Sequence, residues 1–278
     1  MEADSRSGRA PVSVVIPCYN CASTIGRALA SVAAQTWPPE EIIVVDDASH
    51  DGGETARSLE EAAKAHGLQQ VRVIHLEENR GPGAARNVGW EAAGRPYVAF
   101  LDSDDTWHPM KLAIQLGYML RSPAVVFSAH RWRVWRGKGE TAEQAVRDSN
   151  LTTRVLRARS LLLRNVVSTS TVVLRRDIPC RFPERRFSED YELWLDLLLR
   201  GYRGVLIERA LAYIHKAPYG EGGLSRGLWS MEKGELETYW RLFRRGQIGW
   251  HDLALCAPWS LAKYARRVIL SVVRRVGS

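Results

Sequence analysis

The strongest constraint on the fold is an alternation of short β-branched apolar runs with longer Ala-rich segments between residues 12 and 101. This alternation is typical of βαβα units, in which nearly continuous apolar strands form a parallel sheet covered by helices on both faces. We therefore expect an α/β fold with a Rossmann-like, mostly parallel sheet. The expected strands are Val12–Pro17, Glu41–Asp46, Val71–His75 and Tyr97–Leu101, with helices at Ser23–Gln35, Gly53–His66 and Ala84–Ala93.

The second half of the chain has a less regular pattern. The basic segment Arg131–Arg136 contains two tryptophans, and the polar stretch Gly137–Thr153 is typical of an exposed insertion. Glycines at 220–223 predict a mobile loop, and the pattern from Leu228 to the end is helical. The other expected elements are helices at Pro109–Arg121, Ala158–Arg164 and Ser188–Arg200 and strands at Ala124–Ser128, Thr171–Leu174 and Val205–His215.

The formal net charge of +8 is distributed unevenly over the 278 residues. The net charge is −6 over residues 1–120, +10 over 121–186, −2 over 187–225 and +6 over 226–278. An acidic first segment suits a site that takes positive charge from a metal, and basic later segments suit contact with anionic lipid or an anionic substrate. Because no nucleic-acid-binding motif accompanies the basic residues, we expect no nucleic-acid partner.

The sequence predicts a cytoplasmic protein. It contains no apolar stretch of the roughly 18–20 residues that cross a bilayer, and its first residues lack the apolar core of a signal peptide. Four cysteines are too few for a disulfide scaffold and fit a reducing compartment. Cys18 and Cys21 form a Cys-x-x-Cys pair where redox centres occur, but neither a zinc-ligand partner pair nor a thioredoxin-like strand pattern accompanies them.

Polar side chains follow each of the four predicted parallel strands. Ligands of open α/β sheets bind beyond the carboxyl ends of the strands, so we expect these clusters to share one site. The clusters are Cys18–Asn20, Asp46–Ser49, Glu77–Arg80 and Asp102–Asp105.

The most acidic cluster holds Asp102, Asp104 and Asp105 within four residues. Three carboxylates so close together repel one another unless a cation lies among them. Mg²⁺ and Mn²⁺ take oxygen ligands and keep positions open for phosphates, so the cluster suits a metal with a diphosphate. The alternative is a solvated N-cap of the following helix.

The other clusters suit a nucleotide. Side chains alternate along a strand, so only one of Asp46 and Asp47 faces a given ligand, where it would accept hydrogen bonds from a base or ribose. Capping of the following helix is their alternative role. Tyr19 suits stacking on a base, with Pro17 fixing the turn. The loop 79–87 contains glycine and two arginines and runs into a helix, which suits phosphate oxygens, although it matches neither nucleotide-binding glycine motif.

Taken in order, these motifs resemble those of glycosyltransferase family 2, which has the GT-A fold. The resemblance implies a catalytic domain at 11–216, with a nucleotide-sugar half at 11–121 and an acceptor half at 122–216, followed by a loop and a basic amphipathic helical tail at 217–278. The motifs that carry it are Val-Ser-Val-Val-Ile-Pro-Cys-Tyr-Asn, Ile-Ile-Val-Val-Asp-Asp-Ala-Ser, Gly-Pro-Gly-Ala-Ala-Arg-Asn and Phe-Leu-Asp-Ser-Asp-Asp.

The resemblance also assigns roles to individual residues. It implies that Asp102 and Asp104 form the D-x-D motif, with Asp104 as first candidate for metal ligation and Asp105 as second. His215 would be a late metal ligand or diphosphate contact, although Ile214 stands where Arg is frequent in the family. The donor would be contacted by Pro17, Tyr19 and Asn20, by Asp46 or Asp47, by Arg80 or Arg86, and by Asp102 and Ser103.

The segment Phe187–Trp194 is similar to the family's Glu-Asp motif, which opens an acceptor-side helix. The Asp of this pair is the general base in inverting members, which implies that Asp190 accepts the proton of the acceptor hydroxyl. Glu189 and Trp194 would lie on the acceptor side. The alternative is that Ser188, Glu189 and Asp190 only begin a helix.

The segment Trp259–Val276 combines an apolar face with lysine and arginine elsewhere. It is either an interfacial helix on an anionic membrane or a helix whose apolar stripe packs against the catalytic domain. The apolar face consists of Leu261, Ala265, Val268, Ile269, Val272 and Val276.

The residues and the resemblance together predict an inverting glycosyltransferase that uses Mg²⁺ or Mn²⁺. It would transfer a sugar from a nucleoside diphosphate, with a UDP-sugar as the expected donor, to a hydroxyl of a saccharide or lipid-linked acceptor in cell-surface polysaccharide assembly. A nucleotide-sugar-forming nucleotidyltransferase is the competing enzyme, but the turn after the first strand lacks its Gly-rich basic loop. A catalytically silent relative would not need Asp190. If the tail binds lipid, the location is the inner face of the membrane.

Overall fold

The computed structural model describes residues 8–135, 151–215 and 227–276, with side chains described as far as residue 269. The strands are β1 Ala10–Cys18, β2 Pro39–Asp46, β3 Val71–His75, β4 Tyr97–Phe100, β5 Asp105–Trp107, β6 Val125–Val134, β7 Thr153–Val155, β8 Val173–Arg175 and β9 Arg203–Ile214. The helices are α1 Ala22–Ala33, α2 Glu54–Ala65, α3 Pro82–Ala92, α4 Lys111–Arg121, α5 Ala158–Leu163, the 3₁₀ helix η2 Thr169–Thr171, α6 Glu189–Leu199, α7 Leu228–Arg244 and α8 Trp250–Val276.

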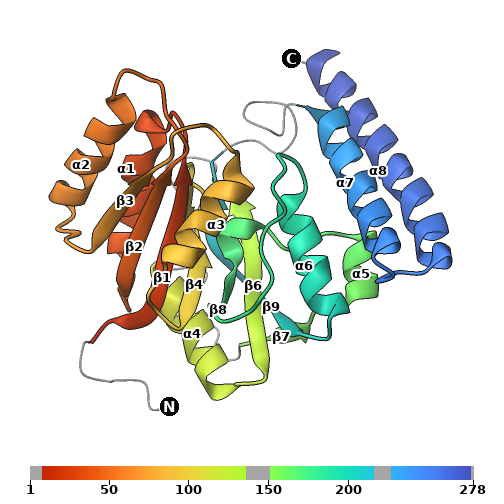
Figure 1. Cartoon of the computed structure of the whole chain (residues 1–278), viewed down its shortest axis with the longest axis horizontal. Helices are drawn as coiled ribbons and strands as arrows, with labels where there is room; N and C mark the ends of the chain where they lie inside the picture. Colours follow the sequence, from red (N-terminus) through yellow and green to blue (C-terminus); the bar gives the residue numbers. More distant parts are fainter. Residues whose placement is uncertain (1–7, 136–150, 216–226, 277–278) are drawn as a thin grey trace.

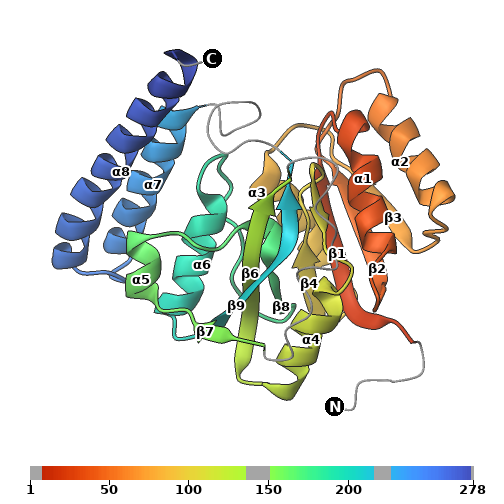
Figure 2. The same cartoon turned by 180° about the vertical axis from the view of Figure 1, so that it is seen from behind.

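A central sheet lies between two layers of helices. Helix α3 is in front of the sheet in Figure 1, and α1 is in front of it in the reverse view of Figure 2. The strand order is β3-β2-β1-β4-β8-β6-β9-β5, and β7 pairs with β9. Strands β1, β2, β3 and β4 are parallel, as their apolar sequences predict. β8 is antiparallel to β4 and β6, and β5 and β7 are antiparallel to β9, so the second half of the sheet is mixed.

The alternation of side chains along the strands divides the interior into two cores. On β1, Val14 and Ile16 belong to a core shared with α1, α2 and α4. Val15 points the other way, into a core shared with α3, α6, α7 and α8. Both faces of the sheet are therefore covered, which explains the apolar runs Val14–Ile16 of β1 and Ile42–Val45 of β2.

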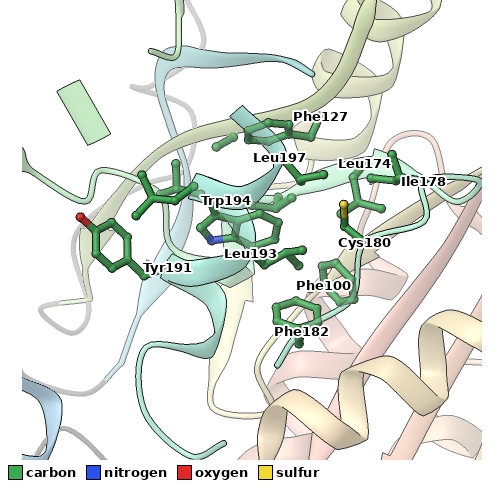
Figure 3. Close-up of a cluster of buried hydrophobic side chains, with 14 of the residues drawn as sticks. Phe100, Phe127, Leu174, Ile178, Cys180, Phe182, Tyr191, Leu193, Trp194 and Leu197 are labelled. Atoms are coloured by element: carbon green, nitrogen blue, oxygen red, sulfur yellow. The ribbon is translucent and has the colours of Figure 1, made fainter. Parts of the chain in front are cut away.

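Aromatic rings fix α6 against the sheet (Figure 3). The ring centroids of Phe182 lie 5.1 Å from Phe100 and 5.7 Å from Trp194, and Trp194 stacks on Phe127 at 6.0 Å. Such pairs stabilise by about 0.5–1.5 kcal/mol each beyond the burial of their surface. Because the exposed fraction of Trp194 is 0%, the predicted acceptor-side role of this residue is wrong, and its function is to anchor the helix.

Short and mixed elements differ most from the sequence predictions. β5 begins at Asp105, inside the acidic cluster, and was not expected because three polar-flanked residues carry no strand pattern. β6 continues to Val134, so it includes most of the basic tryptophan segment. The predicted segment at 205–215 is the single strand β9. Residues 137–150 of the predicted insertion 137–153 lie outside the described residues, as does the glycine-containing loop at 217–226. The last residue of the predicted insertion, Thr153, is instead the first residue of β7, which pairs with β9.

Helices α7 and α8 lie side by side at the end of the molecule opposite α2 in both views (Figures 1 and 2). They are joined by a turn at Gly246, whose φ of 67° favours glycine. Their buried side chains, Tyr239, Leu242, Ile248 and Cys256, belong to the same core as α3 and α6. Among the helices of the described segments, none has the length and apolarity required to cross a membrane.

Candidate active site

A cleft of about 1310 Å³ opens beyond the carboxyl ends of β1 and β4. It is lined by the polar clusters after β1, β2 and β4, by the starts of α3 and α6, and by α7 and α8. The prediction that Asp47, Asp104 and Asp190 share one cavity is confirmed. The predicted site residues in its lining are Pro17, Tyr19, Asp47, Arg86, Asp102, Ser103, Asp104, Glu189 and Asp190.

Strand alternation separates the two acids that follow β2. Asp47 lies in the cleft, whereas Asp46 borders a different cavity of about 590 Å³ beside α2. Asp46 accepts hydrogen bonds from the Ser49 hydroxyl at 2.5 Å and lies 3.1 Å from His75 Nδ1. The base-recognition role predicted for one acid of the pair is therefore left to Asp47. Neither acid caps α2, because the side chain of Asp51 accepts the hydrogen bond from the backbone N–H of Thr55 in the first turn of that helix.

Asp47 organises the loop that enters α3. Its two carboxylate oxygens accept the backbone N–H groups of Arg80 and Gly81, each at 2.8 Å. Gly81 has a φ of 87°, which a side chain would strain. The Arg80 guanidinium points to Glu184 at 2.9 Å, on the surface rather than in the cleft lining. Of the two arginines predicted to lie near the nucleotide, Arg86 alone lines the cleft.

Tyr19 and Asn20 shape the other wall of the nucleotide end. The ring of Tyr19 is 43% exposed and lines the cleft, and its hydroxyl lies 3.0 Å from His50 Nδ1. Asn20 does not line the cleft; its side-chain oxygen accepts the His50 N–H at 3.0 Å and so holds the loop after β2. Asn20 is thus a positioning residue in this structure, while Tyr19 presents an open aromatic surface.

Cys18 and Cys21 form a disulfide at the turn between β1 and α1. The prediction from the sequence that the cysteines are reduced is therefore wrong for Cys18 and Cys21. Cys18 also lines the cleft, and its carbonyl accepts the N–H of Asp47 at 2.8 Å. The cross-link therefore joins the end of β1 to Cys21, the residue before α1, and the backbone hydrogen bond joins the end of β1 to the residue after β2.

Backbone strain gathers at this cleft. Within the described residues, the non-glycine residues with positive φ are Asn20, Ala48 and Ser188, at 47°, 58° and 57°. Each directly neighbours a predicted site residue. Left-handed conformations at non-glycine residues cost on the order of 1–3 kcal/mol and persist where surrounding contacts impose them, which is common at functional sites.

Arg86 is the electrostatic centre of the cleft. Its guanidinium contacts Asp102 Oδ1 at 2.6 Å and Glu189 Oε1 at 2.9 Å, and only 6% of its side chain is exposed. Burial lowers the pKa of Arg86, but the charges of Asp102 and Glu189 outweigh burial and raise it. Arg86 therefore stays charged and joins the D-x-D segment to the start of α6.

Asp190 is partly buried at the first turn of α6. Thr169 Oγ1 donates to its Oδ2 at 3.0 Å, and the Tyr191 N–H donates to its Oδ1 at 2.7 Å. Burial raises the pKa of Asp190 although Arg86 opposes it. Burial and the charge of Asp190 also raise the pKa of Glu189 to about 7. The Ser188 side chain makes no capping bond to the helix, whereas Glu189 and Asp190 both line the cleft.

The acidic cluster divides between the cleft and the interior. Asp104 lines the cleft, and its backbone carbonyl accepts hydrogen bonds from the Arg27 guanidinium at 2.8 and 3.3 Å. Asp105 points inward on β5, where it accepts the Ser170 hydroxyl at 2.7 Å, so its placement does not suit metal ligation. The helix-cap alternative is wrong, because α4 starts at Lys111 after an N-cap residue, Met110, without a side-chain cap bond.

His215 lies at the end of β9. Its Nε2 is 2.9 Å from Thr106 Oγ1, and its ring packs beside Trp135. Burial lowers the pKa of His215, and the positive charge of Arg27 lowers it further, while the negative charge of Asp104 acts in the opposite direction. The imidazole is therefore neutral at physiological pH, the form that binds metals, although it is outside the lining of the cleft.

A divalent cation fits this site only together with substrate oxygens. Among the described residues, no three His, Cys, Asp or Glu side chains are grouped to hold a metal ion. Mg²⁺ commonly binds through one or two carboxylates, with phosphates and water completing its shell. Asp104 in the cleft, with Asp102 beside it on Arg86, matches that arrangement.

Sequence reasoning missed the hydroxyl residues of η2 and the arginine of α1. Thr169 and Ser170 hold Asp190 and Asp105, and Arg27 holds the backbone of Asp104. The only available signal was the run of serine and threonine before β8. Nothing in the spacing predicts that these hydroxyls face carboxylates 21 and 65 residues away.

The parallel half-sheet, the mixed second half and the cleft at the strand ends define a GT-A glycosyltransferase fold. The mannosyltransferase PcManGT from Pyrobaculum calidifontis, solved in complex with GDP-Man and Mn²⁺, superposes with a TM-score of 0.67 at 20% sequence identity, over 95% of this chain and 76% of that one. The predicted α/β GT-A fold with C-terminal helices is confirmed.

The sequence model of the family described as glycosyl transferase family 2 matches residues 13–179 of this chain. The chain therefore belongs to this family. The putative teichuronic acid biosynthesis glycosyltransferase TuaG of Bacillus subtilis is 29% identical over 93% of this chain and 96% of its own. The UDP-Glc:alpha-D-GlcNAc-diphosphoundecaprenol beta-1,3-glucosyltransferase WfgD of Escherichia coli is 29% identical over 67% of this chain and 69% of its own. Four further curated relatives are longer, and the chain spans 27–40% of their length.

Proposed function

We propose that this protein is a metal-dependent inverting glycosyltransferase that moves a sugar from a UDP-sugar to a hydroxyl of a saccharide or lipid-linked acceptor. The observation that carries the proposal is the position of Asp190, held by Thr169 and a backbone amide in the same cleft as Asp104 and Tyr19. The printed names of TuaG and WfgD support a role in cell-surface polysaccharide assembly.

In the proposed reaction the acceptor hydroxyl attacks the anomeric carbon from the face opposite the leaving nucleoside diphosphate, which inverts the configuration. Asp190 accepts the proton of that hydroxyl, and its fixed hydrogen bonds leave the carboxylate in one orientation. Arg86 holds Asp102 and Glu189 in place around the reacting groups. Bound through Asp104 and the diphosphate, Mg²⁺ or Mn²⁺ would supply positive charge to the leaving group.

A thermal-shift panel tests donor class and metal use together. We expect UDP with Mn²⁺ to raise the unfolding temperature by several degrees, because ligand at 100 times its Kd adds about 2.7 kcal/mol of stability. UDP without metal should give a smaller shift. In Asp104→Asn the additional effect of Mn²⁺ should be lost.

The matched control is Asp177→Asn, which removes an exposed carboxylate paired with Arg175 outside the cleft. It should retain the metal-dependent shift. If GDP or another nucleotide shifts the protein instead of UDP, the donor proposal is wrong. If no nucleoside diphosphate shifts it, the transferase proposal fails.

We also propose that α8 contacts the inner face of an anionic membrane. In support, Leu255, Leu261 and Ile269 are 60%, 43% and 62% exposed on α8. Two basic residues of the same helix turn toward α7, where Lys263 and Arg267 pair with Glu235 and Glu232 at 2.6 Å, whereas Arg266 is exposed and suits an anionic surface. Burying such an apolar stripe in the acyl boundary is favourable at about 25 cal/mol per Å².

Binding to phosphatidylglycerol vesicles tests the membrane contact. Replacing Leu255, Leu261 and Ile269 together by Ser should weaken co-sedimentation at least about tenfold, since each side chain loses roughly 1.5–3 kcal/mol of transfer energy when fully buried. Leu120→Ser is the control, because Leu120 is 39% exposed on α4. Equal binding of the triple variant and the native protein would exclude this surface.

A further inference from the structure

The wall of the cleft formed by α5 and α8 is basic. Arg164, Lys263, Arg266 and Arg267 all line the cleft there. The wall is fixed in place because the carbonyl of Leu163, the last residue of α5, accepts hydrogen bonds from Trp259 Nε1 at 3.0 Å and from Lys263 Nζ at 3.3 Å. These contacts hold Arg164 beside α8.

Two of the four cations are already neutralised. Lys263 pairs with Glu235 and Arg267 pairs with Glu232, each at 2.6 Å, and the exposed fraction of Glu232 is 0%. These pairs satisfy carboxylates of α7 that burial would otherwise destabilise. Their charges therefore cancel and contribute little net attraction for a ligand.

The other two cations are surplus. Arg164 and Arg266 are exposed, and neither guanidinium group has a hydrogen-bond or ion-pair partner within the segments that the structure describes. Their guanidinium groups leave this wall with an excess of two positive charges. Planar guanidinium groups bind phosphate oxygens in a bidentate manner, so a pair of them suits a diphosphate better than a single carboxylate.

We infer that Arg164 and Arg266 form a subsite for the diphosphate of a lipid-linked acceptor, an inference that rests on the proposed transferase function. Tyr19 and Asp104 follow strands β1 and β4 of the sheet, whereas Arg164 and Arg266 belong to the wall of α5 and α8, and α8 lies at the end of the molecule opposite α2 (Figure 1). We therefore assign the second, anion-binding subsite on the α8 wall to the acceptor. Asp190 belongs to the same cleft, so an acceptor saccharide attached to that diphosphate reaches the base.

The apolar surface of α8 explains why the acceptor carries a lipid. Trp259 both lines the cleft and is 50% exposed, and Leu255 and Leu261 are exposed on the same helix. The lipid chain of an acceptor whose diphosphate occupies the subsite would therefore lie against apolar surface without crossing a polar region. A free sugar phosphate would gain nothing from this surface, whereas a prenyl chain would bury it.

The test uses farnesyl diphosphate as the probe, with UDP and Mn²⁺ present at saturation so that the donor site is filled. Calorimetry should show binding to the native chain, and the Arg164→Gln/Arg266→Gln double variant should bind the probe at least about tenfold more weakly. The control is Arg57→Gln/Arg244→Gln, which removes two exposed arginines outside the cleft and should bind as the native chain does.

Three comparison ligands separate the sources of binding. Inorganic pyrophosphate should bind more weakly than farnesyl diphosphate, and farnesol should bind weakly to both the native chain and the double variant. Equal affinity of the native chain and the double variant for farnesyl diphosphate would overturn the subsite, as would absence of binding to the native chain. If the double variant instead loses only its binding to phosphatidylglycerol vesicles and still binds farnesyl diphosphate, the two arginines bind membrane headgroups and the acceptor subsite is wrong.

Nucleotide binding distinguishes this inference from the proposed function. Suppose that the native chain and the double variant bind UDP with Mn²⁺ equally and also bind farnesyl diphosphate equally. The subsite inference is then wrong, while the proposed transferase function stands. If no nucleoside diphosphate binds the native chain, the transferase proposal fails as well.

Discussion

Asp190→Asn is expected to lower sugar transfer by about 10²–10⁴-fold, the range that general base catalysis contributes. The amide is similar in shape to the carboxylate but cannot accept the proton of the acceptor hydroxyl. The variant should bind UDP with unchanged affinity, since Asp190 contacts Thr169 and the Tyr191 backbone rather than the nucleotide end of the cleft. The measurement is UDP release from a UDP-sugar in the presence of lipid-linked saccharides, with UDP affinity determined by calorimetry.

Asp177→Asn is again the matched control, because it makes the same chemical change on the exposed surface. A parallel loss of UDP affinity in Asp190→Asn would show that the residue supports the donor site and would remove its assignment as base. Retention of full transfer activity would contradict the mechanism directly.

The pH dependence of the native reaction gives an independent readout of the same residue. Burial and the charge of Asp190 raise the pKa of Glu189 to about 7, and burial raises the pKa of Asp190. Since these carboxyls hold protons more tightly than in water, the pair gains a proton as the pH falls through about 7, and the rate should fall with it. The residual activity of Asp190→Asn should lack this acid limb.

The parallel half of the sheet and its polar strand ends could be predicted because both depend on local sequence. Runs such as Glu41–Asp46 are apolar because both faces are covered, and a carboxylate directly after such a run reaches the ligand edge. Asp47 and Asp104 were placed correctly in one cleft for this reason, whereas Asp190, at the start of α6, was assigned to the site by the family resemblance. The short strands β5 and β7 have three residues each, too few to carry a period, and were not predicted, whereas β8 overlaps the predicted strand Thr171–Leu174.

The orientation of individual side chains could not be predicted, because partners distant in sequence determine it. Asp105 turns inward because β5 pairs with β9 and the Ser170 hydroxyl donates a hydrogen bond to its carboxylate there. Trp194 is buried because two aromatic residues from outside α6, Phe127 and Phe182, pack against it. The apolar stripe of α8 is visible in the sequence, but its outward direction follows from the pairing of Lys263 and Arg267 with α7.

Arg86→Met should produce the largest loss of stability, about 3–5 kcal/mol of unfolding free energy, which is the usual cost of removing one partner from a buried ion pair. Methionine has a similar volume but leaves Glu189, with only 8% of its side chain exposed, without its cation. The effect is measured by denaturant unfolding monitored by tryptophan fluorescence. Arg80→Met is the control, because the pair of Arg80 with Glu184 is exposed and should contribute less than about 1 kcal/mol.

The Arg86→Met/Glu189→Gln double variant separates the cost of an unpaired charge from that of lost packing. Neutralising Glu189 should recover part of the lost stability, because the buried group no longer has to ionise. The single variant should also be less stable at pH 8 than at pH 5. The pKa of Glu189 is already raised above its ordinary value and rises further without Arg86, so the folded state increasingly resists ionisation as the pH increases. If the single and double variants are equally unstable at both pH values, Arg86 stabilises the fold through packing, and the ion pairs with Asp102 and Glu189 do not organise this cleft.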